Sequence, residues 1–113
     1  MQQPATHAPT AVRVNGTMLP QFVTKTVMVP GKVIAPSNGQ HLTLQAADGA
    51  QILVHVNQAV SPSVQFLEVT GVAEPDGSVR MVSFAEFPDT VDMALLNDAI
   101  QLQFTHSHLF MDG

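Results

Sequence analysis

The last quarter of the sequence, residues 87–110, constrains the fold most, because it reads as one long helix after a series of short extended segments. No Pro or Gly interrupts residues 91–111, and Pro88 ends the segment that precedes them. Asp89 or Thr90 can cap the first free amides, and Asp92 then adds negative charge to the first turn, where the helix dipole favours it. We therefore predict a C-terminal helix over residues 89–110.

Apolar residues occupy two sides of this predicted helix, whereas the helix of a single domain usually shows one apolar stripe. One stripe consists of Val91, Leu95, Ala99 and Leu102, and the other of Met93, Leu96, Ile100 and Phe104. The polar residues between them form a narrow strip: Asp92, Asn97, Asp98, Gln101 and Gln103. Two stripes indicate burial on two sides.

We expect one side of the helix to pack on its own domain and the other to contact helices of other chains, since a large exposed apolar surface marks an interface. In the alternative interpretation, the whole helix is buried against its own domain. The predicted partner interface comprises Val91, Leu95, Leu96, Ala99, Ile100, Leu102 and Phe104.

The residues before the helix predict short strands joined by turns. The expected strands cover residues 27–35, 41–45, 51–56, 66–73 and 78–86. Asn38-Gly39 and Asp48-Gly49 mark tight turns, and residues 74–77 form a third turn containing Pro and Gly. Pro30-Gly31 interrupts the first strand, which indicates a bend at its middle. A brief helical turn over residues 18–23, capped by Asn15 or Thr17, precedes the strands.

Five strands, with a long connection over residues 57–65, give the strand count and spacing of an OB-fold barrel. An SH3-like barrel is the alternative that the strand count leaves open. The predicted fold class is all-β with a terminal helix: a five-stranded OB-fold barrel over residues 12–88 plus a C-terminal α-helix over residues 89–110. Residues 1–11 are polar, contain two prolines and predict a flexible tail.

The charge of the chain argues against a strong autonomous nucleic-acid binder. Its net charge is −5, and its four cations are Arg13, Lys25, Lys32 and Arg80. Affinity for nucleic acid rises with each phosphate that a protein neutralises, so four scattered cations form a weak footprint. Charged residues make up 12% of the chain, well below the usual share of about a quarter, which indicates that some surface is covered by partners.

The sequence predicts no membrane segment, no secretory signal and no catalytic site. It has no Cys, which excludes disulfides and thiol nucleophiles. No phosphate-binding loop, nucleophile elbow or paired-carboxylate motif is visible. His106 and His108 lie two residues apart and share no helix face, and His7 lies in the tail. We therefore expect a soluble intracellular protein that is not an enzyme and uses no metal and no cofactor.

The expected outer face of strands 41–45 and 51–56 is the surface with which OB folds hold single strands. It offers His41, Thr43, Gln45, Gln51, Leu53 and His55. The protein has no Trp or Tyr, and no Phe lies on these two strands, so this face forgoes stacking worth about 1–3 kcal/mol per base. Lys32 and Arg80 are the candidate residues for a weak contact with a nucleic-acid backbone.

Several segments of the chain resemble the smallest subunit of replication protein A. These are RVNGTMLPQF at residues 13–22, Val27, GKV at 31–33, EVTGV at 68–72 and the helix at 91–102. The resemblance implies an OB fold whose C-terminal helix joins one helix from each of the middle and large OB-fold subunits in a three-helix bundle.

The same resemblance implies a nuclear, heterotrimeric complex that coats single-stranded DNA in replication, repair and recombination. In such a complex this chain serves assembly and reaches DNA mainly through its partners. The small OB subunit of a telomeric single-strand-binding trimer has a similar plan and remains an alternative. A third possibility is an autonomous, weak single-strand-binding module.

Overall fold

The computed structural model describes residues 11–35 and 39–112, with side chains described as far as residue 105. Its elements in order are β1 Val12–Arg13, the 3₁₀ turn η2 Leu19–Phe22, β2 Thr26–Ala35, β3 His41–Ala46, β4 Gln51–His55, β5 Phe66–Ala73, β6 Val79–Phe87 and α1 Met93–Asp112. The expectations for residues 1–10, for the turn at residues 37–38 and for the side chains of His7, His106 and His108 lie outside the described residues.

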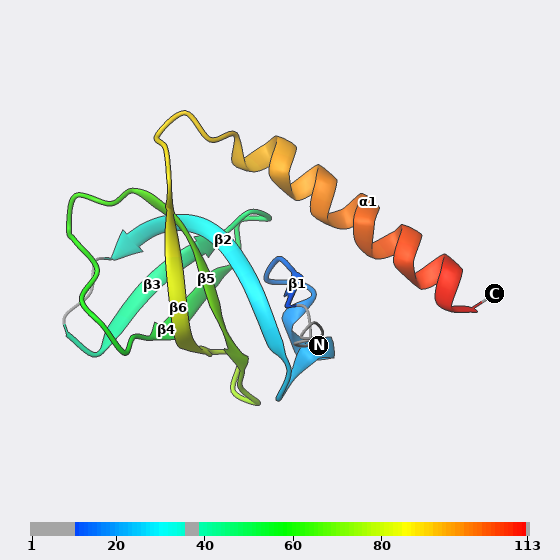
Figure 1. Ribbon diagram of the computed structural model, residues 1–113, viewed down its shortest axis with the longest axis horizontal. Helices are drawn as coiled ribbons and strands as arrows, with labels where there is room; N and C mark the ends of the chain where they lie inside the picture. The colour runs from blue at the N-terminus through cyan, green and yellow to red at the C-terminus, as the bar shows by residue number, and fades with distance from the viewer. Residues whose placement is uncertain (1–10, 36–38, 113) are drawn as a thin grey trace, which may run out of the picture.

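Five strands form a closed ring, as the sequence predicts. Within it the neighbours run β2, β3, β4, β6 and β5, and β5 pairs with β2 to close the circle. The pairings are antiparallel except that of β4 with β6, which is parallel. The two-residue strand β1 lies parallel to β2 on the outside of the closure (Figure 1).

The first long strand, β2, bends and takes part in two pairings, which confirms the interpretation of Pro30-Gly31. Its first part, from Thr26 to Lys32, pairs with β5, and its second part, from Gly31 to Ala35, pairs with β3. At Gly31 the strands approach so closely that a Cβ atom would lie 2.5 Å from the carbonyl oxygen of Gln45. Glycine is therefore required there by space.

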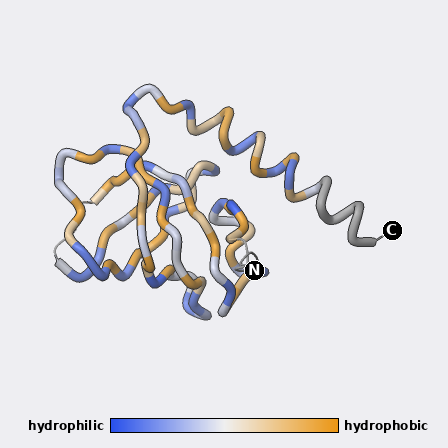
Figure 2. The backbone as a smooth tube through the Cα atoms, in the orientation of Figure 1, coloured by the Kyte–Doolittle hydropathy of each residue, from blue (hydrophilic) through white to orange (hydrophobic). Residues whose placement is uncertain are grey.

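Buried and more exposed side chains alternate along β3 and β4. Figure 2 shows hydrophobic and hydrophilic residues following one another along the backbone of the strands. The inner residues are Val27, Val29, Leu42, Leu44, Ile52, Val54, Leu67, Val69, Val79 and Met81, all buried. Ile34 and Val82 are exceptions because each is the extra residue at a register shift, and each leaves an apolar side chain exposed.

The helix α1 begins at Met93, so the predicted start at Asp89 or Thr90 was wrong. The N–H of Val91 donates to the carbonyl of Pro88 at 3.0 Å, which makes a separate turn before the helix. Asp92 is the capping residue, because its Oδ1 accepts the N–H of Leu95 at 3.0 Å. Asp92 therefore lies before the first turn, and Val91 lies outside the helix.

α1 follows β6 and runs past the side of the ring where β1 and η2 lie (Figure 1). Among the described residues, no helix combines the length and the apolar character that crossing a lipid bilayer requires.

Candidate subunit interface on the C-terminal helix

The two apolar stripes of α1 have different environments. Ile100 is 1% exposed and belongs to the hydrophobic core, and Leu96 and Phe104 are partly buried against that core. Leu95 and Leu102 are 66% and 73% exposed. Each residue turns the helix by about 100°, so both leucines lie roughly opposite Ile100. α1 thus packs on its own domain with one face and presents two large leucines on the other.

This division corrects the predicted partner interface. Leu96, Ile100 and Phe104 pack on the chain's own domain, because they continue the core at the side of the ring where α1 lies. Leu95, Ala99 and Leu102 remain exposed on the opposite face. Val91 is half-buried in the turn before the helix. The exposed face of α1, defined by Leu95, Ala99 and Leu102, is therefore the candidate interface.

Among the described side chains, Asn15 and Phe22, both between β1 and β2, contact α1. Asn15 donates a hydrogen bond from Nδ2 to Oδ1 of Asn97 at 2.8 Å. The rings of Phe22 and Phe104 meet edge to face with centroids 6.2 Å apart. Asn97 was predicted to lie in the narrow polar strip, but it is half-buried and faces the domain. The sequence did carry a sign of this, because Met93, Asn97, Ile100 and Phe104 are spaced by four, three and four residues and therefore lie on one face of the helix.

The residues that receive α1 are themselves held to the ring. Arg13 forms an ion pair with Glu68 of β5, with Nε 2.5 Å from Oε2 and Nη2 3.1 Å from Oε1. The next residue, Val14, is buried and donates its N–H to the carbonyl of Met28 on β2 at 2.8 Å. β1 is therefore fixed to two strands of the ring although it is only two residues long.

Asp48, in the turn between β3 and β4, binds Gly16 and Thr17, which precede η2. It accepts the N–H of Gly16 at 3.1 Å and both the N–H and the hydroxyl of Thr17, at 3.0 and 2.7 Å. Partial burial raises the pKa of Asp48, but the hydrogen bonds from Thr17, Gly16 and Ala50 outweigh it and leave the pKa below its ordinary value. The carboxylate form thus stabilises the approach to η2.

The outer face of β3 and β4 places the predicted nucleic-acid residues side by side. Its cross-strand pairs are His41 with His55, Thr43 with Leu53 and Gln45 with Gln51. Lys32 pairs with Gln45 at one end of this face, and Arg80 pairs with His55 at the other. The two cations are therefore at opposite ends and do not form a cluster.

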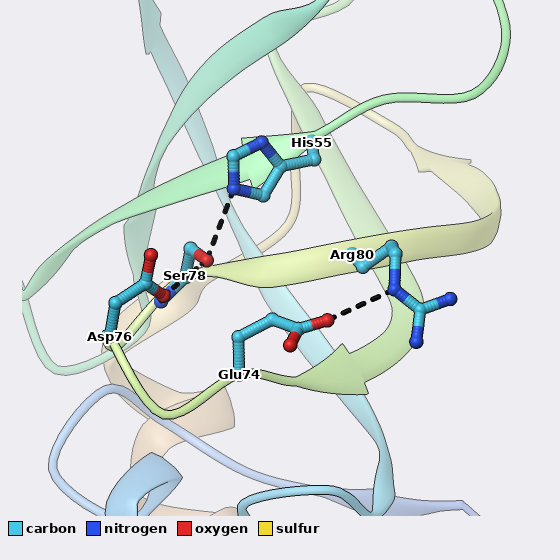
Figure 3. A network of polar contacts seen from close by, with 5 residues as sticks. All are labelled: His55, Glu74, Asp76, Ser78 and Arg80. Atoms are coloured by element: carbon cyan, nitrogen blue, oxygen red, sulfur yellow. Dashed lines mark hydrogen bonds and ion pairs between the residues drawn. The ribbon is translucent and has the colours of Figure 1, made fainter.

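Arg80 already has a carboxylate partner. Its Nε lies 3.0 Å from Oε2 of Glu74, and both side chains extend from the hairpin between β5 and β6 (Figure 3). An exposed ion pair of this kind contributes little to stability. However, it neutralises the guanidinium that a phosphate would need.

A chain of hydrogen bonds fixes the orientation of His55 on the same face (Figure 3). The hydroxyl of Ser78 donates to Oδ1 of Asp76 at 2.6 Å, so its oxygen accepts from Nε2–H of His55 at 3.2 Å. The hydroxyl and the N–H of Ser78, together with the nearby His55, lower the pKa of Asp76.

His41 and His55 are two neighbouring side chains of a type that can bind metals. Their rings meet edge to face with centroids 5.0 Å apart. Across the described residues, no group of three His, Cys, Asp or Glu side chains converges as a structural metal site would require.

Most of the chain matches the model of a known protein family. The model of that family, replication factor A protein 3, matches residues 1–110. The chain belongs to this family.

Two relatives from Arabidopsis thaliana, both 14 kDa subunits of replication protein A, agree with this assignment. The chain is 31% identical to one of them, over 94% of this chain and 98% of that protein. It is 30% identical to the other, over 85% and 92% of the two chains. The resemblance to the smallest subunit of replication protein A is therefore confirmed.

Solved structures confirm the OB fold. A chain in the structure of U. maydis replication protein A bound to single-stranded DNA superposes with a TM-score of 0.79 and 28% identity, over 88% of this chain and 94% of that one. The S. pombe Stn1–Ten1 complex contains a chain with a TM-score of 0.71 at 12% identity, over 89% and 98% of the two chains. At that identity the second likeness shows the fold alone. Both named relatives are subunits of replication protein A.

Proposed function

We propose that this chain is a non-catalytic structural subunit of a heterotrimeric complex that binds single-stranded DNA, and that it assembles the complex through the exposed face of α1. The partners are the middle and large OB-fold subunits of the same complex. Single-stranded DNA is reached mainly through them, and the complex works in the nucleus in replication, repair and recombination. Its family membership supports the choice of complex.

The observation that carries the assembly role is the exposure of Leu95 and Leu102, at 66% and 73%, on a helix whose opposite face is anchored. Full burial of a leucine side chain stabilises an association by about 1.5–3 kcal/mol. Leu95 and Leu102 are seven residues apart with Ala99 between them, which is the spacing of a helix that packs along other helices. A helical partner for this face is therefore favoured.

The strand face supports a minor role in gripping DNA. Arg80 is paired with Glu74, Lys32 lies at the far end, and the chain carries a net charge of −5. Such a surface offers few free cations for counterion release. We therefore propose that any contact of DNA with this chain is secondary to the contacts of its partners.

The complex of replication protein A is preferred to a telomeric trimer on the strength of the sequence matches. Identity to the chains of replication protein A is 28–31%, whereas identity to the Stn1–Ten1 chain and to S. pombe Ten1 is 12% and 16%. The fold is common to both kinds of complex and does not distinguish them.

The test is a double substitution, Leu95→Glu with Leu102→Glu, in the full chain co-expressed with the middle and large subunits of its own organism. Because both side chains are exposed, the ring should remain folded while two charges enter the partner interface. We expect affinity purification to recover the two larger subunits with the wild-type chain and less than about a hundredth as much with the variant.

Gln101→Glu with Gln103→Glu is the matched control, since it adds the same charge to exposed positions of the same helix. This control should assemble as the wild type does. Circular dichroism of both variants checks that the fold is retained. Normal assembly of the Leu95→Glu, Leu102→Glu variant would mean that the exposed face of α1 is not the interface.

A further inference from the structure

The segment from the end of β1 through η2 contacts α1 through Asn15 and Phe22. We use the term docking segment for residues 13–22. Each of its first residues has a separate contact: Arg13 with Glu68, Val14 with Met28, and Gly16 and Thr17 with Asp48. Asn15 donates a side-chain hydrogen bond to Asn97 of α1.

The orientation of the Asn15 amide follows from its two partners. The N–H of Met18 lies 3.2 Å from Oδ1 of Asn15, and a backbone N–H requires an acceptor. Nδ2 must therefore point the other way, toward Oδ1 of Asn97 at 2.8 Å. Asn15 is 1% exposed, so loss of the Asn97 oxygen leaves a buried donor without its partner. One side chain thus caps the turn before η2 and holds the helix.

In the part of α1 whose side chains are described, apolar residues also contact the domain. Asn97, Ile100 and Phe104 follow one another at spacings of three and four, so they lie on one face of the helix. Ile100 enters the core and Phe104 meets Phe22. Apolar contacts are non-directional and tolerate rotation or sliding of a helix. A buried hydrogen bond between two amides depends on direction and does not tolerate such movement. A single buried Asn fixes the register of a coiled coil for the same reason.

We propose that Asn15 is a positioning residue, which fixes the rotation of α1 through Asn97 and thereby turns Leu95 and Leu102 away from the domain. The docking segment is then an orienting platform for the exposed face of α1. The role of those two leucines in this inference rests on the proposed function. A helix held in its binding orientation before partners arrive loses less entropy when they bind.

The test uses Asn97, which is half-buried, so that the core of the ring is left intact. Asn97→Ala removes the acceptor for Asn15 and also raises intrinsic helix propensity, so loss of helix cannot explain an effect. Asn97→Asp keeps an acceptor oxygen at the same place and serves as the conservative variant. Amide hydrogen exchange of the full chain, followed residue by residue, reports on α1 and on the ring strands separately.

We expect exchange in α1 to become about tenfold faster in Asn97→Ala, the effect of leaving one buried donor without its partner. Exchange in β2 to β6 should be unchanged, and Asn97→Asp should restore α1 close to the wild type. Unchanged exchange of α1 in Asn97→Ala, or an equal acceleration in the ring strands, would overturn the inference.

The two proposals fail separately. The Leu95→Glu, Leu102→Glu variant should leave exchange in α1 unchanged in the isolated chain, because neither side chain contacts the core. If that variant still assembles while Asn97→Ala releases α1, the proposed function fails and the positioning of α1 by Asn15 stands. If Asn97→Ala does not release α1, the inference fails whatever the purification shows.

Discussion

Three glycines in this chain are required for two different structural reasons. Gly31 and Gly71 sit where strands approach closely, and at Gly71 a Cβ atom would overlap the carbonyl oxygen of Arg80. Gly77 is needed for a different reason, since its φ is +90° and its surroundings are open. These two reasons predict different costs of substitution.

Gly31→Ala should lower the free energy of unfolding by about 2–4 kcal/mol, because the added methyl meets backbone of β3 that cannot move without breaking the β2–β3 pairing. Gly77→Ala is the matched comparison and should cost about 1 kcal/mol, the usual penalty for a residue forced to positive φ. Urea unfolding of both variants measures the difference. Equal costs would show that the ring adapts at Gly31.

The lowered pKa of Asp48 should make part of the folding stability depend on pH in the acidic range. Its pKa is lowered in the folded chain, so it binds a proton less readily when folded than when unfolded. Its stabilising effect is therefore complete above the ordinary Asp pKa of about 3.9 and is lost as the pH falls through the folded value. Asp48→Asn should remove this component, so the variant's unfolding free energy should fall less steeply below about pH 4. Identical slopes for variant and wild type would contradict this role of Asp48.

At the scale of elements, α1 shows what the sequence could and could not predict. The two apolar stripes predicted one side on the domain and one against partner helices. The structure shows the first side, through Ile100, and the second stays a prediction. Periodicity does not reveal which stripe faces the chain's own ring, because that depends on η2 and on Asn15, 82 residues away from Asn97 in sequence. The helix start was misplaced because Asp89, Thr90 and Asp92 all can cap, and the turn from Pro88 to Val91 decides among them.

The strands were easier to predict than the helix contacts. Turn residues and alternation located the five ring strands to within about a residue at each end, because both signals are local. The pairing of β4 with β6 and the contact of Arg13 with Glu68 are not local, and no pattern within either segment specifies them. The helix could therefore be predicted as an element, while the division of its residues between a buried and an exposed face required the structure.

Ile100 and Leu102 offer a matched pair for the two faces of α1. Ile100→Ala should lower the free energy of unfolding by about 2–4 kcal/mol, since it removes a side chain that is 1% exposed. Leu102→Ala should change it by less than about 0.5 kcal/mol, because that side chain is 73% exposed. Thermal or urea unfolding of the isolated chain gives both values. Similar losses for the two variants would place both stripes in the domain's own core.

At the scale of the whole molecule, the ring and the helix share one core, and the exposed face of α1 leaves two leucines in contact with solvent. Because Ile100 belongs to the core, removing α1 would expose the ring as well as the interface. Deletion of the helix therefore cannot separate assembly from folding, and substitutions or labels on the exposed face are required. The chain contains no Cys, so a single introduced thiol can report on one position.

The most direct measurement of the central claim compares thiol labelling of Leu102→Cys in the free chain and in the assembled complex, with Gln58→Cys, on the exposed loop between β4 and β5, as the reference. If the exposed face of α1 binds the two larger subunits, assembly should slow labelling at position 102 by at least about tenfold and leave position 58 unchanged. Equal labelling rates at position 102 in the free and assembled states would contradict the account and move the interface to the ring.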